Sequence, residues 1–354
     1  MRPTRPYLAR LSWVTVRLPG PWLWLLAVLA FLLALAAAWP HLSERWERWR
    51  HGMPPGVHLV DAEQGIRLGL AGYLSAEVQA QLQDLAVRLN KAPVNARWDP
   101  VREQVIPEQP GREVDVEATM QAIRNARRGS DVQLVWKPVP PRVTRSFFEP
   151  VRQGPPGPWA ALMFNVAWGE EHLPALLKAL AGFNVQATFF LDGQWAQKFP
   201  EWGRKLQESG HEVASHGFRH DHVEKMDPGS LASLIAENER LLRRQGVQPA
   251  PLFAPPYGEV NGQIVRTAAE MGYRTILWTV DTVDWKRPPA AVIADRVFRR
   301  YVPGSLILMH PTEPTVQALP IIIQGLHQKG VRLMTVSQLL EAGSPREPSS
   351  AHPD

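Results

Sequence analysis

The sequence of 354 residues contains no cysteine. This absence excludes disulfide bonds, thiolate zinc sites, a cysteine nucleophile and a lipid-modified cysteine anchor. It leaves the cellular compartment open, because exported bacterial proteins often lack cysteine as well. Hydrophobic residues make up 45% and charged residues 21% of the chain, which is typical of a globular protein with room for two folded units.

The sequence also lacks the motifs of nucleotide and nucleic-acid binding. There is no P-loop, and no G-x-G-x-x-G follows an expected strand. The net charge is +5, but the basic residues are scattered among acidic ones instead of being gathered with aromatic residues. We therefore expect neither a nucleotide nor a nucleic acid as partner. The basic excess is typical of a solvated surface, or of one suited to an anionic envelope polymer.

One long uncharged segment lies near the start of the chain. It runs from Trp22 to Trp39, and as a helix it would extend about 27 Å, close to the thickness of a hydrocarbon core. The residues before it include no acid and four arginines: Arg2, Arg5, Arg10 and Arg17. We therefore expect residues 1–21 in the cytoplasm, a single-pass membrane anchor at 22–39, and the remaining chain on the extracytoplasmic side.

A cleavable signal peptide is the alternative, because Ala36, Ala37 and Ala38 offer small residues to a signal peptidase. We favour an uncleaved anchor, since the apolar run is longer than the usual core of a signal peptide. Either interpretation places the rest of the chain outside. Residues 40–57 are then expected to form a charged stem beside the membrane.

Residues 58–149 are expected to form a small α+β domain. Apolar residues recur with helical spacing from Glu77 to Leu89 and from Val114 to Ala126, whereas Val132 to Val139 alternates like a half-buried strand. This order resembles the small peptidoglycan-binding domain of VanW-type envelope proteins over Leu82 to Thr144. The alternative is a spacer that has no ligand of its own.

A linker rich in proline and glycine is expected at residues 150–158, followed by alternating strands and helices from 159 to 343. Residues 274–281 read as one strand and residues 195–210 as one helix. Such alternation predicts an α/β fold with a parallel sheet, and the polar residues after the strands suggest a barrel whose site lies at its carboxyl-terminal rim. Residues 344–354 are expected to be a disordered tail.

Histidines and aspartates follow several of these strands. His216 and His220 lie four residues apart, a spacing at which neutral imidazoles can hold a zinc-like ion if oxygen ligands complete the shell. Asp281 and Asp284 end one expected strand, and His310 ends another. A pair of histidines alone is weak evidence, but their occurrence together with these groups favours a metal-centred hydrolytic site.

Together these motifs resemble those of the NodB-type polysaccharide deacetylases, carbohydrate esterase family four. The resemblance runs from about Ala160 to Leu340 and includes an ATFF strand at residues 187–190 and the segment GHEVASHGFRH at residues 210–220. It implies a distorted (β/α) barrel that hydrolyses N-acetyl groups of a cell-wall polysaccharide such as peptidoglycan. It also implies a divalent metal, with zinc as the first expectation and cobalt as the alternative.

The resemblance assigns roles to the residues that match the family's motifs. His216 and His220 correspond to metal ligands, His310 to the general acid that protonates the leaving amine, and Asp284 to the residue that orients this acid. Contacts to the acetyl group and to the rest of the substrate are expected from a further set of residues: Tyr257, Leu308, Trp285, Asp281 and Trp168.

The sequence departs from the family's pattern at the base. Asn165 stands where the catalytic base is expected, and an amide cannot take up a proton at useful pH. Val166 stands at the position of the metal-binding aspartate, and Ala254 replaces the arginine that pairs with the base. Because an anion and its cationic partner are lost together, no buried charge is left unpaired.

Glu170 and Glu171 are candidates for the missing metal ligand, and Glu170 also for the missing base, because they follow the strand that carries Asn165. Carboxylates at the start of a helix also complement the helix dipole, and that role can explain one of them. Two hypotheses stay open: an active metal-dependent deacetylase, and a glycan-binding or scaffold protein on the same fold without turnover. The segment after this strand resembles the YlxY-like members of the family, which are associated with sporulation.

Overall fold

The computed structural model describes residues 20–342. The four N-terminal arginines and the expected tail lie outside this part of the chain. Contacts divide the chain into two units, one made of residues 1–92 and 111–139 and the other of residues 93–110 and 140–354.

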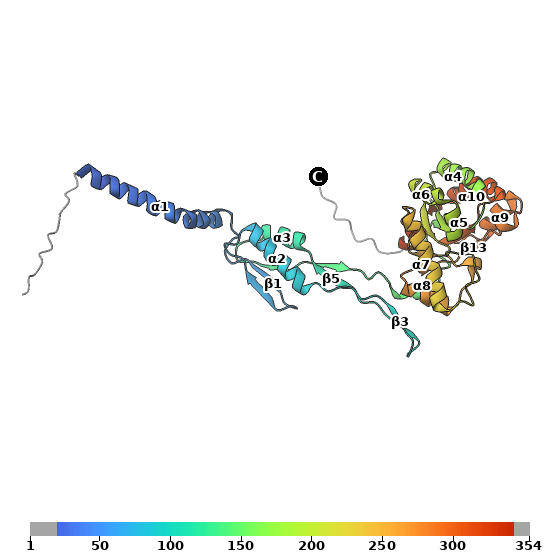
Figure 1. Cartoon of the computed structure of the whole chain (residues 1–354), viewed down its shortest axis with the longest axis horizontal. Helices are drawn as coiled ribbons and strands as arrows, with labels where there is room; N and C mark the ends of the chain where they lie inside the picture. Colours follow the sequence, from blue (N-terminus) through green and yellow to red (C-terminus); the bar gives the residue numbers. More distant parts are fainter. Residues whose placement is uncertain (1–19, 343–354) are drawn as a thin grey trace, which may run out of the picture. The chain divides into compact units, whose positions relative to one another are not determined.

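A long helix, α1 (Gly20–His51), begins the first unit (Figure 1). Within its stretch Leu25–Arg48, an 18-residue window has a mean hydropathy of 2.1, so the helix is long and apolar enough to cross a membrane, and it lies near the N-terminus. An anchor and a signal sequence both fit this description. The helix continues through Pro40 and ends at His51, so the charged residues expected to form a separate stem belong to the same helix.

The globular part of the first unit is the small α+β domain that the sequence predicts. A three-stranded sheet has β1 at its centre, paired antiparallel with β2 and parallel with β6, and two helices contact each other over it. Its core is formed by apolar side chains with no exposed surface, among them Leu59, Leu82 and Ile123. The elements are β1 (His58–Asp61), β2 (Ile66–Gly69), α2 (Ser75–Leu89), β5 (Gly111–Val114), α3 (Val116–Arg124), β6 (Asp131–Gln133) and β7 (Trp136–Val139).

A short hairpin that was expected in the small domain belongs to the second unit by its contacts. It consists of β3 (Arg97–Asp99) and β4 (Gln104–Ile106). The guanidinium of Arg266 lies 4.7 Å from the centre of the Trp98 ring. This contact joins the hairpin to α8 (Gly262–Glu270), so the boundary between the units does not fall at residue 149.

Residues 150–158, expected to be a linker, are instead part of the second unit. The amide of Val151 donates to Thr275, the amide of Gly154 donates to Gly304, and Val151 is 8% exposed. A Cβ atom on Gly304 would lie 2.6 Å from the carbonyl oxygen of Gly154. Glycine therefore serves close backbone packing here, which composition alone did not distinguish from linker flexibility.

The second unit is built on a parallel sheet of eight strands. Their order is β12-β11-β10-β9-β8-β14-β13, and β15 pairs with the first residues of β8. Among the described residues no ladder joins β12 to β13, so the sheet is an open, distorted barrel of the expected type. The strands are β8 (Trp159–Val166), β9 (Thr188–Leu191), β10 (Glu212–Ser215), β11 (Leu252–Phe253), β12 (Arg274–Thr275), β13 (Val280–Asp281), β14 (Ser305–Met309) and β15 (Arg332–Met334).

Alternate residues of the strands enter two different cores. Phe164 of β8 and Phe189 of β9 stack with centroids 5.0 Å apart in the core beneath the outer helices, whereas Met163 and Phe190 belong to a second buried cluster. Figure 1 shows the helices of this unit surrounding its strands. These helices are α4 (Leu173–Gly182), α5 (Gly193–Lys198), α6 (Pro200–Glu208), α7 (Pro228–Arg244), α8, α9 (Ala290–Arg300), α10 (Glu313–Gln328) and α11 (Val336–Glu341).

Two expected elements are divided. The helix expected at 195–210 is interrupted before Pro200, where Phe199 has an extended φ of −127° and separates α5 from α6. A proline disfavours helical geometry in the residue before it, which explains the break. The strand expected at 274–281 is split into β12 and β13, because these two short strands form the opposite ends of the open sheet.

Candidate active-site pocket

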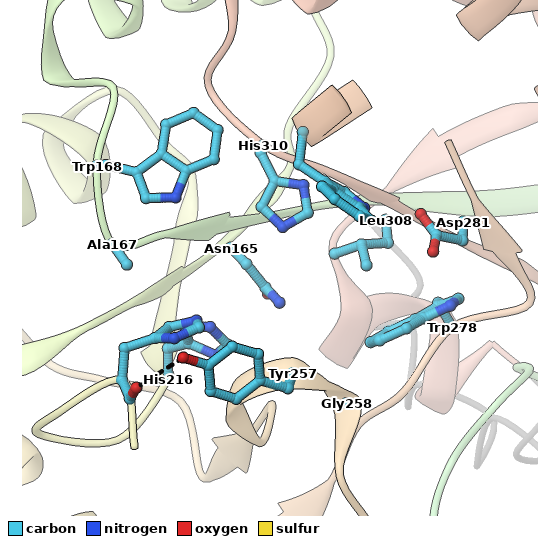
Figure 2. A pocket seen from close by; sticks show the side chains of 12 residues that line it. Asn165, Ala167, Trp168, His216, Tyr257, Gly258, Trp278, Asp281, Leu308 and His310 are labelled. Atoms are coloured by element: carbon cyan, nitrogen blue, oxygen red, sulfur yellow. Dashed lines mark hydrogen bonds between the residues drawn. The ribbon is translucent and has the colours of Figure 1, made fainter. Parts of the chain in front are cut away.

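The carboxyl ends of the central strands open into a cavity of about 400 Å³. Asn165, near the end of β8, extends into it, and His310 lies across the cavity from Tyr257 (Figure 2). The sequence-predicted residues are largely brought together here. The lining residues are Asn165, Ala167, Trp168, His216, His220, Tyr257, Gly258, Trp278, Asp281, Trp285, Leu308 and His310.

The histidine pair lies on one side of the cavity. His216 follows β10 and is 1% exposed, and its ring centroid is 5.1 Å from that of His220. The Nδ1 atom of His216 lies 2.7 Å from the carbonyl oxygen of Ala254, so Nδ1 donates and Nε2 is left without a proton. Burial lowers the pKa of His216 to about 3 and also lowers the pKa of His220. Both rings are therefore neutral near pH 7, the form that can bind a metal.

His310 is held by a buried carboxyl group on the other side. Asp284 has no exposed surface and accepts from Nδ1 of His310 at 2.8 Å and from the amide of His310 at 2.7 Å. The hydroxyl of Thr315 in α10 donates to the same carboxyl at 2.7 Å. These contacts fix the orientation of the His310 ring and leave its Nε2 atom available to a ligand. Asp284 therefore acts on His310 as an orienting aspartate.

The loop that carries Asp284 is strained and firmly tied. Val283 and Arg287 adopt left-handed φ angles of 54° and 53°, which is costly for a β-branched residue such as valine. The carboxyl of Asp281 accepts from the amide of Val283 at 2.8 Å, and Arg296 donates to the carbonyl of Thr282 at 2.7 Å. Asp281 therefore lines the cavity and also shapes the loop that presents Asp284.

Tyr257 covers the histidine pair from the turn after β11. Its ring lies 4.5 Å from that of His220 and stacks at 4.2 Å on that of His222. Its neighbour Gly258 has a φ of +69°, and a Cβ atom there would lie 2.2 Å from the Trp278 ring. Only glycine allows Trp278 to complete this wall, which agrees with a turn built for close packing.

Trp168 forms the opposite edge of the cavity. Its ring lies parallel to that of His310 with centroids 5.9 Å apart, and the residue is 38% exposed. Gly169 follows with a φ of +87°, and a Cβ atom there would lie 2.2 Å from the carbonyl oxygen of Pro311. This close approach fixes the turn and with it the position of the indole.

The donor atoms present do not complete a metal site of the family's kind. Val166 offers no ligand, and Oδ1 of the 6% exposed Asn165 is buried without a hydrogen-bond partner. Catalytic zinc is usually held by three protein ligands and a water. Between residues 20 and 342, no group of three or more histidine, cysteine, aspartate or glutamate side chains is arranged to hold a metal. His216 and His220 are therefore a pair of nitrogen donors without their oxygen partner.

Glu170 and Glu171 lie apart from this cavity. They begin η2 (Glu170–His172), and an oxygen of Glu171 lies 3.5 Å from the His172 ring. Both line a neighbouring cavity of about 640 Å³, whose wall also includes His220 and Trp168. The structure thus places them beside the histidine pair but does not bring them into one ligand cluster with it.

Asp192 is a buried carboxylate in the wall of this neighbouring cavity. It is 3% exposed and caps α5, where Oδ1 accepts from the amide of Trp195 at 2.9 Å, while Oδ2 is buried without a partner. Burial raises the pKa of Asp192 from its ordinary 3.8 to about 6, and the nearby charge of Asp221 contributes in the same direction. The ionised side chain is therefore costly to the fold near neutral pH.

Three residues that line or support the two cavities escaped the sequence interpretation. Trp278 lies in a segment expected to be plain strand, and its position follows from the split between β12 and β13. Thr315 supports Asp284 from the first turn of α10, which only the tertiary fold brings near. Asp192 carries a local signal as a helix cap before Gly193, but nothing in the sequence shows that one of its oxygens is left unpaired.

Asp192→Asn should stabilise the protein at pH 7.5 by about 1–3 kcal/mol, because each unit of pKa corresponds to about 1.4 kcal/mol and asparagine caps helices as well as aspartate. The raised pKa means that the wild-type free energy of unfolding falls as pH rises from about 4 to 6. That fall should be smaller in the variant, as measured by urea denaturation of the full chain in detergent across this pH range.

Asp227→Asn is the matched control, because Asp227 caps α7 with a pKa lowered by its hydrogen bonds to Ser230. This second cap should show the opposite trend, with stability lost in the variant above pH 4. Equal effects of the two substitutions would contradict the account of Asp192.

Comparisons with known proteins agree with this geometry. Residues 152–276 match the family model "Polysaccharide deacetylase", and residues 69–133 match "Putative peptidoglycan binding domain". An uncharacterised protein, YlxY of Bacillus subtilis, is 35% identical over 70% of this chain and 79% of its own length. A peptidoglycan-N-acetylglucosamine deacetylase of Bacillus cereus is 33% identical over 53% of this chain and 70% of its own.

A solved structure extends the likeness to most of the described chain. It is a CE4 family pseudoenzyme from Bacillus anthracis, 32% identical, with a TM-score of 0.54, and the match covers 74% of this chain and 94% of that one. A mutant of that pseudoenzyme has restored enzymatic activity and matches at 30% identity with the same TM-score. The chain therefore belongs to the polysaccharide deacetylase family, carbohydrate esterase family four, whose members include peptidoglycan deacetylases and a pseudoenzyme.

Proposed function

We propose that this protein binds N-acetylated cell-wall glycan in the cavity beside His216 and His310 and that its own turnover is impaired. The observation that carries the proposal is the end of β8, where Asn165 and Val166 stand in place of two carboxylates. Asn165 cannot take a proton from water, and Val166 cannot bind a metal. The hydrolytic half of the site that needs these groups is therefore lacking, whereas the half that holds the acetylated sugar is intact.

The intact half supports binding. Asp284 orients His310, and the walls formed by Trp168, Tyr257 and Leu308 leave an apolar cavity with a few polar groups. Such a cavity suits an acetamido group, whose methyl packs on apolar atoms while its carbonyl and amide need hydrogen bonds. The amide of Asn165 can supply one of them, and the imidazole of His310 can form another through Nε2.

The relatives support the same conclusion. The pseudoenzyme from Bacillus anthracis shares the fold over most of this chain, and a mutant of it has restored enzymatic activity. A member of this family can therefore keep a framework that supports chemistry after its turnover has been lost. We infer the same relation here, with N-acetylglucosamine units of peptidoglycan as the ligand that the named deacetylases suggest.

The cellular location of the protein is proposed from two features of the first unit, its long N-terminal helix and its match to a peptidoglycan-binding domain. We propose that α1 is an uncleaved, single-pass anchor and that both folded units lie on the extracytoplasmic side. The apolar window within Leu25–Arg48 and the match to a peptidoglycan-binding domain support this placement, because glycan is found outside the membrane. The first unit would then hold the chain near its glycan. The association with sporulation stays a prediction.

Restoring the missing groups should restore turnover. Asn165→Asp and Val166→Asp, combined with Ala254→Arg to pair the new base, should release acetate from chitooligosaccharides with zinc at least about a hundredfold faster than the wild type. The wild type should bind these oligosaccharides and release acetate at the rate of a protein-free blank. Acetate is measured with the full chain in detergent, and His310→Ala in the triple variant is the control that should abolish the gain. Acetate release by the wild type would contradict the proposal.

One observation favours a second candidate, a metal-dependent deacetylase that recruits a replacement ligand. Glu170 and His220 line the same cavity, so a rotation of the glutamate side chain could bring an oxygen to the histidine pair. For this candidate, Glu170→Gln should lower zinc-dependent acetate release at least about a hundredfold. Glu171→Gln is the matched control and should change it less than about twofold. If Glu170→Gln releases acetate as the wild type does, this candidate is wrong.

A further inference from the structure

The neighbouring cavity has a polar wall that the roles proposed above do not use. It is about 640 Å³ in volume and lies beside the first cavity, with which it shares Ala167, Trp168 and His220. Its wall includes the start of α5, which contributes Asp192 and Trp195. These two residues are 3% and 4% exposed, so they are buried parts of the wall.

Two polar atoms of this wall have no partner in the protein. Oδ2 of Asp192 is a buried acceptor without a donor, and Nε1 of Trp195 is a buried donor without an acceptor. Buried polar atoms are rarely left unpaired, because each one loses its hydrogen bonds to water without gaining a partner in the protein. The ionised side chain of Asp192 also destabilises the fold near neutral pH. Such a cost is typical of a group that serves binding and not stability.

The chemistry of these two atoms limits what can satisfy them. Asp192 needs a donor and Trp195 needs an acceptor, and a hydroxyl can serve either atom because it carries both a proton and a lone pair. A simple cation cannot accept, and a simple anion cannot donate. Trp168 is 38% exposed and lines both cavities, and its indole is an apolar group against which the ring of a sugar can pack.

We propose that the neighbouring cavity is a second saccharide subsite, which holds the sugar residue next to the acetylated one through hydroxyls that donate to Asp192 and accept from Trp195. The inference rests on the proposed function, because it assumes that the first cavity binds a unit of the same glycan. The chain of sugars then passes Ala167, Trp168 and His220, the residues common to the two cavities. Length of glycan, and not only the acetyl group, is thereby recognised.

The test compares a short and a long probe on the full chain in detergent. By calorimetry, the wild type should bind tetra-N-acetylchitotetraose at least about tenfold more tightly than N-acetylglucosamine. Asp192→Asn and Trp195→Phe should each weaken binding of the tetrasaccharide about three- to tenfold, the effect of one hydrogen bond, and leave monosaccharide binding unchanged. Asp227→Asn and Trp202→Phe are matched controls outside the cavity and should bind both probes as the wild type does.

The outcomes separate this inference from the proposed function. If the wild type binds neither probe, the proposed function fails, and the subsite fails with it. If it binds both probes equally and neither variant changes this, a structural water alone satisfies the two atoms, and only the subsite is wrong. A thermal melt of each variant guards against misfolding, and loss of tetrasaccharide binding by an Asp192→Asn protein that melts no lower than the wild type would support the subsite.

Discussion

The structure depends on the burial of strand β8. Its ladders join β9, β14 and β15, and every residue from Ala160 to Val166 is buried. A carboxylate buried at the end of such a strand needs a metal, a cation or hydrogen-bond donors to compensate its charge, because a lone buried carboxylate destabilises the fold by several kcal/mol. Asn165, Val166 and Ala254 are mutually consistent in this respect. Neutral residues at all three positions leave no buried charge at this end of the sheet that would need a metal.

The other half of the site obeys a different constraint. Asp284 is as deeply buried as the end of β8, but three donors from His310 and Thr315 compensate its charge within the protein. It therefore needs no metal and can persist without one. This difference explains how an oriented histidine, a strained supporting loop and an apolar cavity can occur beside a strand end that carries no carboxylate.

The sequence predicted the parts of the molecule in which local pattern and tertiary structure agree. The alternation of strands and helices gave the parallel sheet, and residues that follow strands, such as His216 and His310, met at one rim because parallel strands end together. The prediction failed where composition is ambiguous. Proline and glycine at 150–158 indicated a linker, but this segment pairs with the sheet, and the strand at 274–281 is divided between the two sheet ends.

The details of the site were beyond the sequence for a physical reason. Spacing placed Glu170 and Glu171 near the metal position, but the left-handed turn at Gly169 directs them to the neighbouring cavity. Unpaired atoms, such as Oδ2 of Asp192, are a property of the packed interior and leave no trace in a pattern of residues. The sequence thus identified the family and the missing groups, and the structure was needed to locate what remains.

His216 and His220, which lack an oxygen ligand beside them in the described part of the chain, are not expected to hold a metal. The most direct measurement is the zinc content of the full chain after equilibration with zinc and gel filtration, determined by mass spectrometry. The account predicts far less than one zinc per chain for the wild type and close to one for a variant with aspartate at both Asn165 and Val166. Stoichiometric zinc in the wild type, lost on His216→Ala, would contradict it.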